Sequence, residues 1–130
     1  MASLVVVDSD LLIDFLRGRG PGADLTRTLL REARLRLTAV TAFELRLGAD
    51  FLARRAEILR LFRSRTLGLD VNSALLAGQA FTALRRQGVE IGMADCLQAG
   101  ICLRHGLALA TRNRRHFTRI DRLRLIDVDE

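Results

Sequence analysis

The sequence of 130 residues predicts an α/β fold with a central, mostly parallel sheet of about four to five strands and helices on both faces. Short apolar runs, suited to buried strands, alternate along the chain with longer segments of helical periodicity. The first run, residues 3–8 (SLVVVD), is continuously apolar up to its last residue, as expected for a strand buried on both faces. The length and the 49% hydrophobic content suit a single domain, residues 1–130, with a packed core.

The first half of the chain supplies two strands and three helices. Residues 11–18 (LLIDFLRG) have helical periodicity, and Gly18 closes this helix. The clearest loop follows at residues 18–22 (GRGPG). The remaining elements of this half are a helix at 23–34, a strand at 35–38 (LRLT) and a helix at 41–65 with a break near Gly48.

The second half repeats the alternation and ends in a strand. A strand at 66–70 precedes a helix at 72–88, which Asn72 is expected to cap and Gly88 to stop. The other elements of this half are a helix at 94–106, a strand at 107–111 (LALAT) and a closing strand at 122–128 (RLRLIDV).

The charge balance indicates an anionic partner. Twenty-one basic residues, all of them Arg, face fifteen acidic ones, which gives a net charge of +6. A basic surface fits nucleic acid or an acidic protein, although a GC-rich gene would also favour Arg over Lys. Six Phe are the only aromatic residues, which argues against a module that stacks nucleobases on a row of aromatics.

Cys96 and Cys102 lie six positions apart on one predicted helix, off a common face, and no Cys/His spacing typical of a metal site is present. They are expected to be core thiols in a reducing compartment. The N-terminal segment does not resemble a signal peptide, and no apolar stretch approaches the roughly 18 residues of a membrane span. We therefore expect a cytoplasmic protein.

Acidic residues follow the predicted strands. Ligands of open α/β sheets gather outside the carboxyl ends of the strands, and Asp8 ends the first strand there. Asp10 lies two residues further on. Asp14 falls in the middle of the next helix, where a solvated or Arg-paired position is expected.

Two further acids occupy comparable places, each with a purely structural alternative. Glu44 follows the second strand, but Thr41-x-x-Glu44 also fits a capping box. Asp95 begins the helix in GMADCLQAG, where Asp is a favoured first-turn residue. Asp50 and Asp70 fit simple turn or cap positions.

A last polar segment, residues 110–117 (ATRNRRHF), follows the strand LALA. Carboxylates held close together repel one another unless a cation lies among them, and hard oxygen ligands favour Mg²⁺ or Mn²⁺. Such a site polarises a phosphodiester and activates water, and interleaved arginines would hold the polyanion. The polar residues in this segment are Thr111, Asn113 and His116, with Arg112, Arg114 and Arg115 between them.

The opening motif VVVDSDLL also fits a rival enzyme class. It resembles the first motif of haloacid-dehalogenase-type phosphatases, in which one Asp is the nucleophile and the Asp two residues later is the acid. Those enzymes normally need a basic residue, usually Lys, late in the chain, and this chain contains no Lys.

Taken together, four motifs resemble the PIN-domain ribonucleases, and more narrowly the VapC-type toxins of bacterial toxin–antitoxin pairs. The resemblance covers nearly the whole chain, in order and at ordinary spacing. The motifs are Asp8-Ser9 after the valine strand, Thr41-x-x-Glu44, Ala94-Asp95-x-Leu97 and Thr111-Arg112-Asn113-x-x-His116-Phe117.

This resemblance implies an Mg²⁺- or Mn²⁺-dependent endoribonuclease acting on tRNA, rRNA or mRNA. Family members often carry a further Asp where this chain has Asn113 or His116, so a fourth carboxylate and a full second metal site are not expected. His116 is expected to be a loop residue beside Phe117 or a proton shuttle. The implied metal ligands are Asp8, Glu44 and Asp95, with Asn113 at the edge of the catalytic site, Ser9, Thr41 and Thr111 in support, and Arg112, Arg114 and Arg115 on the RNA.

The resemblance also implies two protein partners: a cognate VapB-type antitoxin and a second copy of the chain. Such antitoxins lay an amphipathic helix and a tail across the toxin, and helices 23–34 and 41–65 offer apolar grooves for them. A PIN-fold RNA-binding module with little catalysis, using its Arg surface, is the alternative function. A basic assembly protein whose acids are all caps and surface charges is a third.

Overall fold

The computed structural model describes residues 2–128, and within them five strands form one parallel sheet in the order β3-β2-β1-β4-β5. The predicted α/β fold is therefore confirmed. The strands are β1 (Val5–Val7), β2 (Leu35–Thr38), β3 (Thr66–Leu67), β4 (Ala108–Ala110) and β5 (Leu125–Ile126). The helices are α1 (Ser9–Arg17), α2 (Pro21–Arg31), α3 (Ala39–Leu47), α4 (Asp50–Ala53), α5 (Arg55–Phe62), α6 (Val71–Arg86), α7 (Met93–His105) and α8 (Arg114–Phe117).

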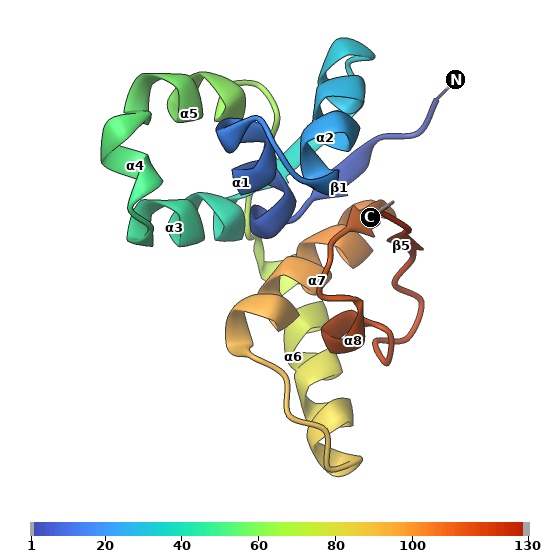
Figure 1. Cartoon of the computed structure of the whole chain (residues 1–130). Coiled ribbons are helices and arrows are strands. Elements are labelled where there is room, and N and C mark those ends of the chain that lie inside the picture. Colours follow the sequence, from blue (N-terminus) through green and yellow to red (C-terminus); the bar gives the residue numbers. More distant parts are fainter. Residues whose placement is uncertain (1, 129–130) are drawn as a thin grey trace.

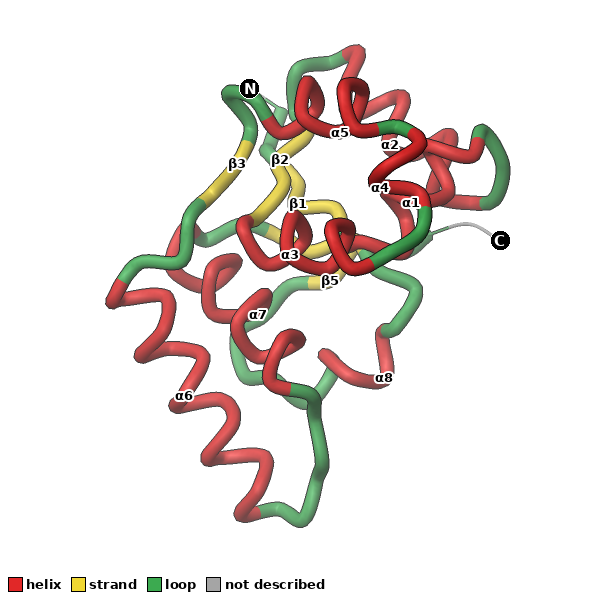
Figure 2. The backbone as a smooth tube through the Cα atoms, turned by 90° about the vertical axis from the view of Figure 1, so that its left-hand side faces the viewer, coloured by secondary structure: helices red, strands yellow, loops and turns green. Residues whose placement is uncertain are grey.

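The sheet is buried between two layers of helices (Figures 1 and 2). Because side chains alternate across a strand, Val5 and Val7 pack into one core with α1, α2 and α5, whereas Val6 packs into a second core with α6, α7 and α8. All three valines are buried. Burial on both faces explains why the sequence of β1 is continuously apolar instead of alternating.

Strand register brings three chain segments to one edge of the sheet. Val7 of β1 pairs with Ala110 of β4, and the backbone N–H of the next residue, Asp8, donates to the Ala110 carbonyl at 2.9 Å. Thr111 therefore lies beside Asp8. On the other side β1 pairs in parallel with β2, whose carboxyl end is Thr38.

At three helix starts the residue that caps or opens the helix differs from the sequence-based expectation, and α1 and α7 start one or two residues earlier than predicted. Thr38, not Thr41, caps α3, because its side chain accepts from the Thr41 backbone N–H at 3.1 Å. The alternative of a Thr41-x-x-Glu44 capping box is therefore excluded. Pro21 begins α2 inside the predicted loop, since its fixed φ and missing N–H suit the first turn of a helix. Asp70, not Asn72, caps α6 by accepting from the Ser73 backbone N–H at 2.7 Å.

The predicted helix 41–65 divides into α3, α4 and α5. Gly48 ends α3 in an extended conformation, and α4 is a four-residue turn. The short helix α8 lies within the polar segment 110–117, where no helix was predicted.

Helices α6 and α7 pack closely in the second layer. A Cβ built at Gly100 of α7 would lie 2.3 Å from the Ser73 carbonyl oxygen of α6, so only glycine allows this approach. Cys96 and Cys102 on α7 are buried free thiols, as predicted. Within residues 2–128, none of the helices has the length and apolarity to cross a bilayer.

Candidate functional site

Asp8 is the buried centre of the site. It precedes α1, and the residue is 4% exposed. The Oδ1 atom accepts from the Ser9 backbone N–H at 2.9 Å, and Oδ2 accepts from the Thr111 hydroxyl at 2.7 Å. Burial raises the pKa of Asp8 to about 6, above the ordinary 3.8, although the Thr111 hydrogen bond lowers it. The neighbouring charges of Asp10 and Glu44 also raise this pKa.

A buried amide joins Asp8 to the next strand. Gln98 of α7 is 1% exposed, and its Nε2 donates to Asp8 Oδ1 at 3.3 Å and to Thr41 Oγ1 at 3.1 Å. The Thr38 hydroxyl donates to Gln98 Oε1. These side chains thus form one buried polar network that connects α7 with the carboxyl ends of β1 and β2.

Glu44 lies on the second turn of α3, half-buried beside this network. Burial raises its pKa, the Ser9 hydroxyl lowers it, and the charges of Asp95 and Asp10 raise it again. Because Thr38 caps the helix, Glu44 has no capping role. The structural alternative for this residue is therefore removed.

Asp95 lies in the first turn of α7, and His116 of α8 contacts it. The distance from His116 Nδ1 to Asp95 Oδ2 is 2.8 Å, and half of the imidazole is exposed. The interpretation of His116 as a loop residue packed beside Phe117 is wrong, since the side chain lies on a helix and contacts an acid of the site. Its use as a proton shuttle stays a prediction.

An arginine bridges the remaining two acids of the opening motif. Arg112 donates its backbone N–H to Asp10 Oδ2 at 3.0 Å, and its guanidinium lies 3.0 Å from Asp14 Oδ2. Asp14 also accepts from the Gly22 backbone N–H at 3.0 Å. Asp14 is thus Arg-paired, as expected. Arg112 in turn contacts both Asp10 and Asp14 of the same chain.

The other predicted site residues lie around this centre. Asn113 is exposed, and its backbone N–H donates to Thr111 Oγ1 at 3.0 Å. Arg114 pairs with Asp127 at 2.9 Å, and Arg115 is exposed. The proposed RNA contacts of Arg112, Arg114 and Arg115, and a role for Asn113 in catalysis, stay predictions.

Asp8, Asp10, Glu44 and Asp95, from here on the acidic site, are linked by electrostatic repulsion across three chain segments. Among residues 2–128, however, no three His, Cys, Asp or Glu side chains are gathered closely enough to form a complete metal-ligand set. The donor chemistry, hard carboxylate oxygens around a buried acid, fits Mg²⁺ or Mn²⁺.

Sequence reasoning missed two members of this network, Thr38 and Gln98, and only one of them carried a signal, Gln98. It interrupts the apolar run of α7, between Leu97 and Ala99, and a lone polar residue on a helix ordinarily faces solvent. Gln98 follows Asp95 by three residues, so both lie on the same face of the helix. This spacing is the feature of the sequence that could have identified Gln98.

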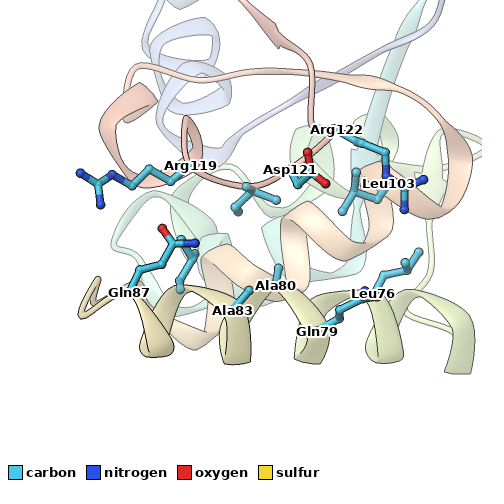
Figure 3. A pocket seen from close by; sticks show the side chains of 11 residues that line it. Leu76, Gln79, Ala80, Ala83, Gln87, Leu103, Arg119, Asp121 and Arg122 are labelled. Atoms are coloured by element: carbon cyan, nitrogen blue, oxygen red, sulfur yellow. The ribbon is translucent and has the colours of Figure 1, made fainter.

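An apolar hollow of about 490 Å³ is lined by residues of α3 and α7, the helices that carry Glu44 and Asp95, although none of the four acids lines it. Phe43, next to Glu44, is 61% exposed, and Met93, two residues before Asp95, is 72% exposed. Leu69 and Leu97 line the same hollow. A separate cavity of about 180 Å³ lies between α6 and the segment 119–122 (Figure 3), and none of the four acids lines it.

Comparison with known proteins gives a consistent result. The PIN domain family model matches residues 5–123. A tRNA(fMet)-specific endonuclease VapC of Shigella flexneri is 30% identical over 127 residues, covering 94% of this chain and 96% of the relative. Ribonuclease VapC10 of Mycobacterium tuberculosis is 33% identical over 122 residues, covering 93% and 91%.

A solved structure of DNA-bound VapBC from Salmonella typhimurium matches with a TM-score of 0.78 and 26% identity, over 97% of this chain and 98% of that chain. These matches favour the PIN fold over the haloacid-dehalogenase alternative for the opening motif. The chain belongs to the PIN-domain family and, within it, to the VapC-type toxins.

Proposed function

We propose that the protein is an Mg²⁺- or Mn²⁺-dependent endoribonuclease toxin whose catalytic centre is the acidic site. The observation that carries the proposal is Asp8, a buried carboxylate with a pKa raised to about 6 and with like-charged neighbours. Its contacts are neutral donors, from Ser9, Thr111 and Gln98. A divalent cation would compensate this charge and draw the acids together.

Asp8, Glu44 and Asp95 are the residues that would hold the ion. A bound Mg²⁺ or Mn²⁺ would polarise the phosphodiester of the substrate and activate a water molecule. The Thr111 hydroxyl and the Gln98 amide hold the Asp8 carboxylate in one orientation. The carboxylate is therefore preorganised before the substrate binds. His116 holds Asp95 from the exposed side.

RNA as the substrate is supported by charge and by relatives. The net charge of +6 attracts a polyanion over long range. The VapC relatives of Shigella flexneri and Mycobacterium tuberculosis are named as an endonuclease specific for tRNA(fMet) and as a ribonuclease. Arg115 is exposed and precedes His116, which contacts Asp95, so it is the first candidate for a phosphate contact.

A VapB-type antitoxin is the proposed inhibitor, because the matched Salmonella structure is a VapBC complex. A second copy of the chain is the proposed oligomeric partner. The apolar hollow around Phe43 and Met93 supports this dimer, since large apolar side chains exposed together ordinarily mark an interface. A Phe43→Asp substitution should convert the dimer to a monomer in size-exclusion chromatography with light scattering.

The central experiment compares wild type with Asp8→Asn, purified free of antitoxin. Asn keeps the size of the side chain and remains a good helix cap. Cleavage of total RNA in Mn²⁺, followed by sequencing of the new ends, should be lost in Asp8→Asn and retained in Asp121→Asn, an exposed acid. Equal cleavage by wild type and Asp8→Asn would refute the proposal.

A catalytically silent RNA-binding module is the second candidate. Two observations favour it. Asn113, which is exposed, stands in place of a fourth acid. In addition, the acids among residues 2–128 are not gathered into a metal-ligand set. RNA binding that persists in EDTA, with no cleavage in Mn²⁺ by protein of verified fold, would select this alternative.

A further inference from the structure

Gln98 occupies an unusual place for a glutamine. Its side chain is 1% exposed, on a helix whose neighbouring buried residues Ala99, Ile101 and Cys102 are apolar. A buried amide is costly unless its donors and acceptor are all satisfied. The Gln98 side chain meets this condition through three partners: the Thr38 hydroxyl on Oε1, and Asp8 Oδ1 and Thr41 Oγ1 on Nε2.

The network fixes which way the amide points. In the flipped orientation Gln98 Oε1 would face the carboxylate of Asp8, and two acceptors would repel one another. The donating NH₂ group is therefore directed at Asp8 and the carbonyl at Thr38. Oriented in this way, the amide favours the ionised form of the carboxylate, the form that a cation requires.

Gln98 also connects the segments that carry the acids. Asp8 follows β1, Thr38 ends β2 and caps the helix of Glu44, and Asp95 lies three residues before Gln98 on α7. One side chain thus contacts or shares an element with every segment that bears a predicted ligand. Its contacts fix the position of α7 relative to the carboxyl ends of the two strands.

Three of the roughly four lone-pair directions of Asp8 are occupied by donors of the chain. Ser9 and Gln98 occupy Oδ1, and Thr111 occupies one direction of Oδ2. The protein thus holds the carboxylate from one side and leaves one direction on Oδ2 for a further partner. Removing the Gln98 donor would allow the carboxylate to rotate away from this orientation.

We infer that Gln98 is a positioning residue for the divalent ion, and this inference rests on the proposed metal-dependent function. The Gln98 side chain orients Asp8 and fixes the position of α7, so that Asp8, Glu44 and Asp95 can share one cation. Interactions that orient metal ligands ordinarily affect metal affinity by roughly 10- to 100-fold. A merely structural glutamine would affect folding alone.

The test measures Mn²⁺ affinity, from the electron paramagnetic resonance signal of free Mn²⁺, for the full chain at neutral pH. Gln98→Met keeps the volume and removes the amide, and we expect affinity to fall by about 10-fold or more. Gln79→Met, an exposed glutamine of α6, is the matched control and should bind like wild type. RNA cleavage should fall through kcat rather than KM, because Gln98 is buried and does not face the substrate.

Loss of stability must be separated from loss of positioning. Ile120→Val in the second core, away from the acidic site, lowers stability without removing a polar contact. If Gln98→Met loses Mn²⁺ affinity and Ile120→Val does not, the inference is supported. If Gln98→Met folds and binds Mn²⁺ as tightly as wild type, the inference is refuted and the proposed function stands. If wild type itself binds no Mn²⁺, both are refuted.

Discussion

Replacing Asp8 by Asn should stabilise the protein in the absence of metal. Burial raises the pKa of Asp8 from 3.8 to about 6. Between these two pH values the folded protein holds a proton that the unfolded chain has released, so the free energy of unfolding falls as the pH rises. At about 1.36 kcal/mol for each pH unit, the ionised carboxylate costs the fold about 3 kcal/mol above pH 6.

The amide introduced by Asp8→Asn would carry no charge and incur no such cost. The Thr111 hydroxyl, which donates to Asp8, can rotate to accept from an amide instead. We therefore expect Asp8→Asn to be more stable than wild type by up to about 3 kcal/mol at pH 7, with the advantage fading towards pH 4.

Urea denaturation in EDTA at several pH values between about 4 and 8 measures this difference directly. Asp121→Asn, at an exposed position, should differ little from wild type at any pH. The reasoning would be refuted by an Asp8→Asn difference that does not change with pH, or by a wild type that is the more stable protein at pH 7.

Three further predictions concern the ion, the helix packing and the thiols. Stabilisation by Mn²⁺, measured as the rise in Tm, should decline as the pH falls below about 6, because the ion must then displace a proton from Asp8; an equal rise at pH 5 and pH 7 would contradict this. Gly100→Ala should destabilise by about 1–3 kcal/mol in urea, since the added Cβ meets the Ser73 carbonyl oxygen, whereas Gly78→Ala, with open space around it, should stabilise by up to about 1 kcal/mol. Burial raises the pKa of Cys102 to about 12 and also raises that of Cys96, so iodoacetamide at pH 8 should label neither thiol in the native state and both in urea.

The parts of the fold that follow from local pattern were predictable. A continuous valine run predicts a strand buried on both faces. Because ligands bind at the carboxyl ends of parallel strands, the acid that follows this run is expected at the ligand-binding edge of the sheet. The position of Asp8 was predicted in this way. The division of 41–65 at Gly48 was foreseen only as a break, because the turn that follows depends on tertiary contacts.

The parts of the site that depend on long-range contacts were not predictable. Thr41-x-x-Glu44 has the spacing of a capping box, yet Thr38 at the end of β2 is better placed to cap, and only strand length decides between them. The ion pairs of Arg112 with Asp10 and Asp14, which lie at the other end of the chain, were not predicted, and its contact with RNA stays a prediction. Sequence pattern carries no record of such a pairing.

Helix capping alone does not account for Asp8. An N-cap ordinarily accepts from the second or third backbone N–H of its helix, whereas Asp8 accepts from that of Ser9, immediately after it, and turns its other oxygen to Thr111. Ser or Asn would cap α1 without burying a charge, so a structural role gives no reason for a carboxylate that costs about 3 kcal/mol at neutral pH. The proposed cation would offset that cost, and the Gln98 amide and the Thr111 hydroxyl, which both donate to the Asp8 carboxylate, would hold it in the orientation the ion needs. Stability and metal affinity should therefore change in opposite directions when Asp8 loses its charge, and in the same direction when Gln98 loses its amide.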